Sequence, residues 1–277
     1  LGHKNGDHIY QFAGLNHFHW HRAFDRNGNE VTKKLLAHVN ERNGGTPVNI
    51  FRAPFPEELL SSMGMVPCGY HRYYYMEEEM LVHSMEEFKE GGTRAEQMLD
   101  VEKELFELYK NTELKEKPKQ LEKRGGAYYS DTACECISAI YNNKQSRMTV
   151  STENRGAIAC LLPESVVEVT CLVSARGAEP VAWGTFPPAA RGWLQMMKAM
   201  EECVIEAAVT GDYGLALEAF TLNPLIRSGR EGKRVLDELL VAHEKYLPQF
   251  GEKIKELKAA GVETDDPVVR ELLREGL

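Results

Sequence analysis

The sequence lacks several features that would place it in a large class of proteins. It has no apolar run near the ~18 residues that a membrane-spanning helix requires. Its six cysteines are scattered over 277 residues and do not form the regular framework of a small secreted domain. The net charge is -9, and the lysines and arginines are mixed with acids rather than gathered in a stripe. We therefore expect a cytoplasmic protein that binds neither a membrane nor nucleic acid.

A glycine-rich phosphate loop is also missing. The glycine pairs 91–92, 125–126 and 211/214 neither follow a strand nor have the G-x-G-x-x-G spacing of a dinucleotide fingerprint. The first seven residues lack the basic and apolar regions of a signal peptide, and a strand-like segment follows them directly. We expect that the chain begins within a longer protein and encodes no nucleotide-binding domain.

Two parts of the chain have the aromatic and β-branched composition of strands. Residues 9–13 and 18–24 predict a hairpin, and 25–29 carries turn residues. Residues 148–151 and 166–173 predict two further strands.

Most of the remainder has helical periodicity. Thr32 is expected to cap a helix that runs to about Asn40, and Cys134 and Cys136 are interpreted as core packing within an apolar helix. The other expected helices are a short one after Pro56, residues 70–88, 93–109 and 130–141, and 188–276 with breaks at Gly211, Pro224, Pro248 and Gly261. The pattern predicts an α+β fold that contains more helix than strand.

Three histidines, His17, His19 and His21, occupy alternate positions after Asn16. Alternate residues of an extended segment share one face, and neutral imidazole is the commonest ligand for a divalent transition metal. The same spacing is compatible with surface or packing histidines on a hairpin.

Tyr70 opens a segment of four tyrosines and one arginine at the start of a predicted helix. Tyrosines at helical spacing are usually core residues, but a phenol beside a cation or metal can act as a base. Arg94 and Arg124 lie at predicted helix starts, where backbone amides also favour anions. Either arginine could hold a phosphate, be solvated or pair with a glutamate.

Together these segments resemble glycoside hydrolase family 4 and, within it, the 6-phospho-β-glucosidases. The matching segments span nearly the whole chain in the family order: 14–17 (GLNH), 70–74 (YHRYY), 93–96 (TRAE), 124–130 (RGGAYYS), 166–169 (VVEV) and 223–226 (NPLI).

The resemblance implies a helix-rich α+β fold like the C-terminal domain of lactate and malate dehydrogenases, with an NAD-binding Rossmann domain before it. Residues 1–277 would be a single C-terminal domain that binds substrate and metal and forms a homo-oligomer, a dimer or tetramer. The implied reaction on a phosphorylated disaccharide or aryl glucoside is oxidation, elimination, water addition and reduction, with NAD and Mn²⁺ or another divalent metal.

Position by position, the resemblance makes His17 the metal ligand, Tyr70 the carbon-2 base, and Asn16 and Arg94 substrate-binding residues, with Arg124 near the substrate. The cysteine ligand of the family, in a Cys-Asn-x-Pro motif, has no counterpart in this chain. We therefore expect the chain alone to be inactive. The alternatives are a non-catalytic oligomerisation module of the same fold, or a relative that acts on phospho-α-glucosides, galactosides or uronides.

Overall fold

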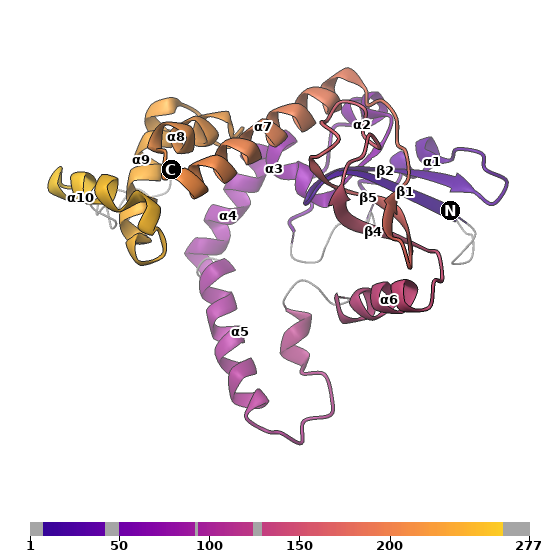
Figure 1. Cartoon of the computed structure of the whole chain (residues 1–277), viewed down its shortest axis with the longest axis horizontal. Coiled ribbons are helices and arrows are strands. Elements are labelled where there is room, and N and C mark those ends of the chain that lie inside the picture. Colours follow the sequence, from indigo (N-terminus) through magenta and orange to yellow (C-terminus); the bar gives the residue numbers. More distant parts are fainter. Residues whose placement is uncertain (1–7, 42–49, 92–93, 124–128, 263–277) are drawn as a thin grey trace. The chain divides into compact units, whose positions relative to one another are not determined.

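The computed structural model describes residues 8–41, 50–91, 94–123 and 129–262 of the chain (Figure 1). The chain forms two compact units, Leu1–Phe186 and Pro187–Leu277. The first unit contains the sheet, and the described part of the second is helical. The predicted α+β class, with more helix than strand, is confirmed. The prediction of a single domain concerns how the two units are joined, and it stays a prediction.

Within the described ranges, the first unit has one antiparallel sheet of six strands. Its order is β3-β2-β1-β5-β4, and β6 also pairs with β5. The strands are β1 (His8–Leu15), β2 (Phe18–Asp25), β3 (Val66–Pro67), β4 (Ser146–Glu153), β5 (Val166–Ser174) and β6 (Gly177–Pro180). The pairing of β1 with β5 places the N-terminal hairpin beside a strand that comes some 150 residues later.

Alternation along the strands separates the two faces of this sheet. Ala13 pairs with Trp20 on one side and with Val169 on the other, and all three are buried on the same face. Gly14, the next residue of β1, pairs with His19 and Glu168, so these two side chains belong to the opposite face. Since Gly14 has no side chain, His19 and Glu168 can approach each other above it.

The helices of the first unit differ from the predictions at two points. They are α1 (Thr32–Leu36), α2 (Glu57–Met63), α3 (Arg72–Tyr75), α4 (Glu77–Gly91), α5 (Arg94–Tyr109) and α6 (Tyr129–Tyr141). The prediction that Thr32 caps a helix to Asn40 is wrong: its hydroxyl accepts the Ala23 amide and donates to Glu30, and α1 ends at Leu36. The predicted helix 70–88 is interrupted at Met76, whose φ of -131° is not helical.

The break at Met76 follows from packing. Met76 is buried in a cluster with Leu36, Phe55 and Leu60, which contains residues from α1 and α2. Arg72, one turn earlier, is also buried, and its guanidinium donates to the Ala53 carbonyl oxygen and lies over the Phe55 ring. These contacts fix α3 separately from α4.

Helix α6 does not bury its cysteines as expected. Cys134 is exposed and Cys136 is half-buried. The interpretation of this pair as core packing is therefore wrong. Much of the apolar surface of α6 is accessible, although the sequence pattern of this helix is apolar.

The second unit contains α7 (Pro188–Thr210), α8 (Tyr213–Leu222), α9 (Gly229–Ala242) and α10 (Gly251–Ala259). The predicted break at Gly211 is confirmed, and Gly211 adopts a left-handed conformation with φ 76° as the C-cap of α7. A Cβ at this position would lie 2.2 Å from the Gln249 carbonyl oxygen. Among the helices that the structure describes, none is long and apolar enough to cross a membrane.

Candidate functional site

The turn between β1 and β2 presents Asn16 and His17, the first two predicted site residues. Leu15 pairs with Phe18, so the turn consists of these two residues only. His17 is exposed and has a φ of 59°, the left-handed region that non-glycine residues seldom adopt. Of the two turn residues only His17, the second, has a positive φ, and this is the position at which a type II turn requires one. The exposed imidazole lies where strands β1 and β2 meet the turn.

Gly14 allows the two strands to approach closely just before this turn. A Cβ on Gly14 would lie 2.4 Å from the Phe18 carbonyl oxygen and 2.5 Å from the His19 Cα. Real Cβ contacts are essentially never this short. Glycine is therefore required at this position for the observed hairpin.

Tyr70 lies directly against His17. Strand β3 pairs with β2, and the Cys68 amide then donates to the His19 carbonyl oxygen. The 3₁₀ helix η1 (Gly69–His71) begins at this point and carries Tyr70 to the turn. The rings of His17 and Tyr70 are stacked, with centroids 4.0 Å apart and an interplanar angle of 8°. The structure thus brings together the predicted metal ligand and the predicted base.

Asn16 has a partner that the sequence analysis did not identify. Its side chain hydrogen-bonds to Glu168 on β5. Burial raises the pKa of the Glu168 carboxyl, and the Asn16 hydrogen bond opposes that rise. Glu168 is also 3.8 Å from the His19 Nε2. The sequence signals for Glu168 were an acid within a β-branched segment and its place in the VVEV segment of the family resemblance, and neither assigned it a role.

His19 and His21 do not converge with His17 on one point. They lie on β2 with stacked rings whose centroids are 4.7 Å apart, and the His21 ring is 4.2 Å from the ring of Phe12. Burial, and secondly the charge of His17, lowers the pKa of His19 to about 4, so its contact with Glu168 is not an ion pair at neutral pH. In the part of the chain that the structure describes, no three His, Cys, Asp or Glu side chains are placed to hold a metal ion. His19 and His21 are packing residues in this arrangement.

Arg94 is the first residue of α5 and is exposed. Its guanidinium donates to the carbonyl oxygen of Lys123, at 2.6 Å. Lys123 directly precedes Arg124 in the chain, so Arg94 bonds the residue beside the second predicted cation. Arg124 itself lies outside the described residues.

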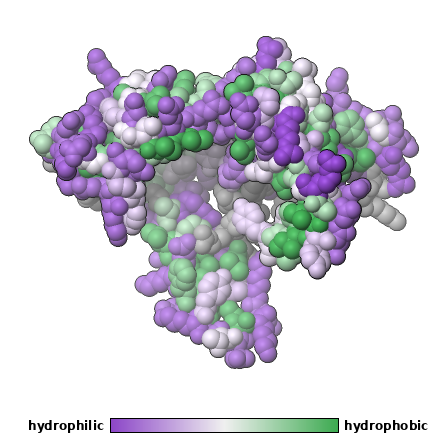
Figure 2. Space-filling model, viewed as in Figure 1, coloured by the Kyte–Doolittle hydropathy of each residue, from purple (hydrophilic) through white to green (hydrophobic). Residues whose placement is uncertain are grey.

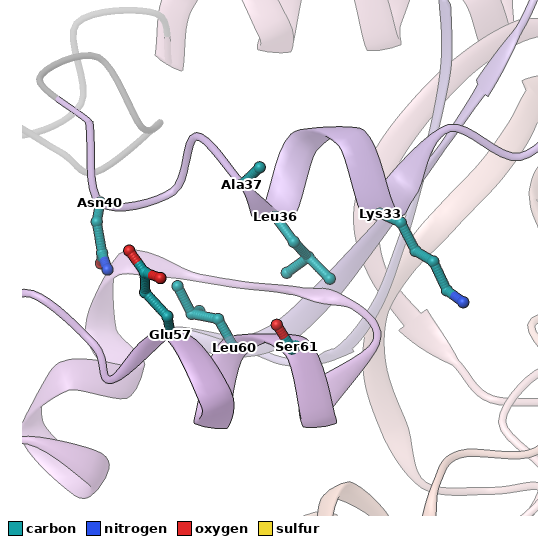
Figure 3. Close-up of a pocket in the computed structure, with 7 residues that line it drawn as sticks. All are labelled: Lys33, Leu36, Ala37, Asn40, Glu57, Leu60 and Ser61. Atoms are coloured by element: carbon teal, nitrogen blue, oxygen red, sulfur yellow. The ribbon is translucent and has the colours of Figure 1, made fainter.

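A pocket of about 460 Å³ between α1 and α2 is separate from these residues (Figure 3). Its polar lining includes Lys33, Asn40, Glu57 and Ser61, and Lys33 points away from the other labelled side chains. The Asn40 amide is bonded to both backbone polar groups of Phe55. The pocket contains none of the predicted site residues.

The comparisons with known proteins identify the family of this chain. Residues 12–226 match the model of the family 4 glycosyl hydrolase C-terminal domain. A probable 6-phospho-β-glucosidase of Bacillus subtilis (strain 168) is 48% identical over 246 residues, covering 88% of this chain and 56% of the relative. A 6-phospho-β-glucosidase of Escherichia coli (strain K12) is 42% identical over 250 residues, covering 89% and 56%. This chain therefore spans about half the length of the curated relatives that it matches.

A solved structure shows the same fold. The 6-phospho-β-glucosidase from Thermotoga maritima, in a form with manganese, NAD⁺ and glucose-6-phosphate, superposes with a TM-score of 0.73 and 28% sequence identity. The match covers 87% of this chain and 55% of that one. The matched family region contains the hairpin turn, Tyr70, Arg94 and Glu168, and the resemblance seen in six short segments is confirmed. The chain belongs to glycoside hydrolase family 4, as its C-terminal domain.

Proposed function

We propose that this chain is the C-terminal part of a 6-phospho-β-glucosidase that uses NAD and Mn²⁺ or another divalent metal. The observation that carries the proposal is the stacked pair of His17 and Tyr70, a metal-ligand type in direct contact with a potential base. The β-glucoside class is supported by the two relatives named for it, which are 48% and 42% identical to this chain. The substrate would be a phosphorylated disaccharide or an aryl glucoside phosphate.

The turn supplies one ligand of a metal site. His17 is exposed at the turn, and imidazole suits a divalent transition metal. The described residues place no group of three potential ligands together, so the remaining ligands would come from elsewhere in a longer protein. NAD would likewise bind mostly outside this chain, which has no glycine-rich phosphate loop.

When bound, NAD and the metal supply hydride acceptance and Lewis acidity at carbon 3 of the sugar. Tyr70 removes the carbon-2 proton through its phenolic oxygen. An isolated phenol ionises only near pH 10, so this role needs positive charge beside the ring. A cation held by His17 would provide it, because the two rings are in contact.

The other predicted residues act by binding. Arg94, at the start of α5, and Arg124 hold the sugar phosphate through their guanidinium groups. Asn16 binds a sugar hydroxyl through its amide. Its orientation is set by Glu168, which is fixed on β5.

The test is a chimera in which the N-terminal part of the Bacillus subtilis relative precedes this chain. We expect hydrolysis of 4-nitrophenyl-β-glucoside 6-phosphate that depends on both NAD and manganese. The matched control is the same chimera with Tyr70→Phe. A chimera that folds and binds NAD but shows no metal-dependent hydrolysis would contradict the proposed activity.

A homo-oligomer, a dimer or tetramer, is the second part of the proposal. Figure 2 shows apolar side chains, in green, among the hydrophilic ones on the surface of the segment that contains α5. Leu99 and Phe106 on α5 are 66% and 65% exposed, and Leu81 and Val82 on α4 are about half exposed. A helical face this apolar is typical of an interface. It supports burial of α4 and α5 between copies of the protein.

A further inference from the structure

Cys68 contacts both the His17 turn and the strand β2 that follows it. Its backbone amide donates to the His19 carbonyl oxygen at 3.1 Å, and its Sγ lies 3.2 Å from the His17 carbonyl oxygen. The same Sγ lies 3.0 Å from the Nδ1 of His71. Cys68 is also the residue that precedes η1, the 3₁₀ helix that contains Tyr70. One buried residue therefore contacts the backbone of His17 and adjoins the 3₁₀ helix that carries Tyr70.

His71 is held rigidly at the other end of this contact. It is fully buried, and its ring is 4.6 Å from the ring of Phe18 and 4.4 Å from that of Trp20. Burial lowers the pKa of His71 to about 3, and burial raises the pKa of the Cys68 thiol. The His17 carbonyl oxygen can only accept, so its contact with Sγ requires a thiol that retains its proton. Full burial among aromatic rings disfavours a charged His71, so its imidazole is neutral.

Hydrogen-bond satisfaction distinguishes the two tautomers of this imidazole. Among the described residues the Nε2 of His71 has no hydrogen-bond partner. A proton on Nε2 would leave a buried N–H unpaired, which costs ~1–3 kcal/mol. A proton on Nδ1 instead donates to the Cys68 Sγ, and the thiol proton is then directed to the His17 carbonyl oxygen. Only the second arrangement gives both donors of the pair, the His71 ring N–H and the Cys68 S–H, an acceptor.

We infer that His71 and Cys68 form a buried hydrogen-bond chain, Nδ1–H to Sγ and S–H to the His17 carbonyl oxygen, that holds His17 against Tyr70. Both are positioning residues, and their importance for catalysis rests on the function proposed above for His17 and Tyr70. The physical need is clear at His17, whose left-handed backbone costs ~1 kcal/mol and persists only where the surroundings fix it.

The first test reads the tautomer in the unaltered chain. The 277-residue protein is labelled with ¹⁵N in its nine histidines, and two-bond ¹⁵N–¹H correlations identify which ring nitrogen of His71 is protonated. We expect the proton on Nδ1, protected from exchange with solvent. A proton on Nε2 would overturn the inference without any variant being made.

The second test reads the stack itself. In Cys68→Ala the carbon-bound protons of the His17 ring should lose the upfield ring-current shift from Tyr70 and approach their positions in Tyr70→Leu. Cys68→Ser, which keeps a donor, should restore most of the shift. Signals of His17 that stay at their original positions in Cys68→Ala would refute the positioning role.

Cys171 supplies the matched control. It is likewise a buried thiol of the first unit, but its Sγ donates to the Val169 carbonyl oxygen of its own strand. Cys171→Ala should reduce stability and leave the His17 signals unchanged; a shift as large as that in Cys68→Ala would mean that general loosening moves the turn. If Cys68→Ala does not fold, the His17 ring shifts in Cys68→Ser and the His71 tautomer in the unaltered chain still test the inference. Since no readout involves turnover, failure here is distinct from failure of the proposed activity.

Discussion

Replacing Gly14 by alanine tests whether close strand approach builds the His17 turn. The added Cβ would lie 2.4 Å from the Phe18 carbonyl oxygen, roughly 1 Å inside an ordinary van der Waals contact. The obstacle is backbone of a paired strand, which cannot rotate away as a side chain can. Overpacking of this kind costs ~1–3 kcal/mol. The positive φ of 154° adds ~1 kcal/mol for a residue with a Cβ.

We therefore expect Gly14→Ala to lower the free energy of unfolding of the first unit by about 2–4 kcal/mol. The assay is urea unfolding followed by tryptophan fluorescence, because Trp20 on β2 is buried and reports on the hairpin. The stacking of His17 on Tyr70, read from the His17 ring protons, should be lost in the folded variant.

Gly28 separates the steric effect from the backbone effect. It has a positive φ of 81° in the turn after β2, but a Cβ there would meet nothing within 4 Å. Gly28→Ala should therefore cost only ~1 kcal/mol and leave the His17 signals in place. Equal losses of stability in the two variants would refute the argument that close approach at Gly14 determines the turn.

The remaining predictions concern the proposed activity, the assembly and pH. In the chimera, Tyr70→Phe should keep the fold and metal affinity, lower turnover by about 10²–10⁴-fold and suppress exchange of the carbon-2 proton with deuterated solvent; near-normal turnover and exchange would place the base elsewhere. His17→Ala should weaken manganese binding, with activity partly restored by excess manganese, whereas an unchanged manganese dependence would exclude His17 as a ligand. The chain alone should not hydrolyse 4-nitrophenyl-β-glucoside 6-phosphate, even with NAD, manganese and reductant. NAD-dependent turnover by the chain alone would contradict the view that catalysis requires residues outside it. Light scattering at micromolar concentration should give a mass above the 31.3 kDa of one chain, and a monomer would argue against the oligomer. Burial lowers the pKa of His21 and of His71 from 6.5 to about 3, so the unfolded chain binds more protons below pH 6.5 and stability should fall by about 1–2 kcal/mol per histidine between pH 7 and pH 5; a constant urea midpoint over this range would show that these histidines are not buried.

Local sequence patterns predicted the secondary structure well where neighbouring residues alone determine the element. The hairpin was predicted from its aromatic strands, and α7 ends at the predicted Gly211 because glycine adopts a left-handed φ easily. The patterns failed where a distant contact decides the outcome. Thr32 bonds to the neighbouring strand instead of capping a helix, and the predicted helix is interrupted at Met76, which packs in a cluster with residues of α1 and α2.

The sequence by itself determined the family and the residue types of the site, because GLNH and YHRYY are contiguous motifs that can be recognised without knowledge of the fold. Only the tertiary structure decided that Tyr70 stacks on His17, that Cys68 joins His71 to the same turn, and that Glu168 reaches Asn16 beside Gly14. These contacts depend on the register of β1 with β5 and of β2 with β3. Register is set by burial over the whole sheet and by turn geometry, and the composition of a single strand does not contain it.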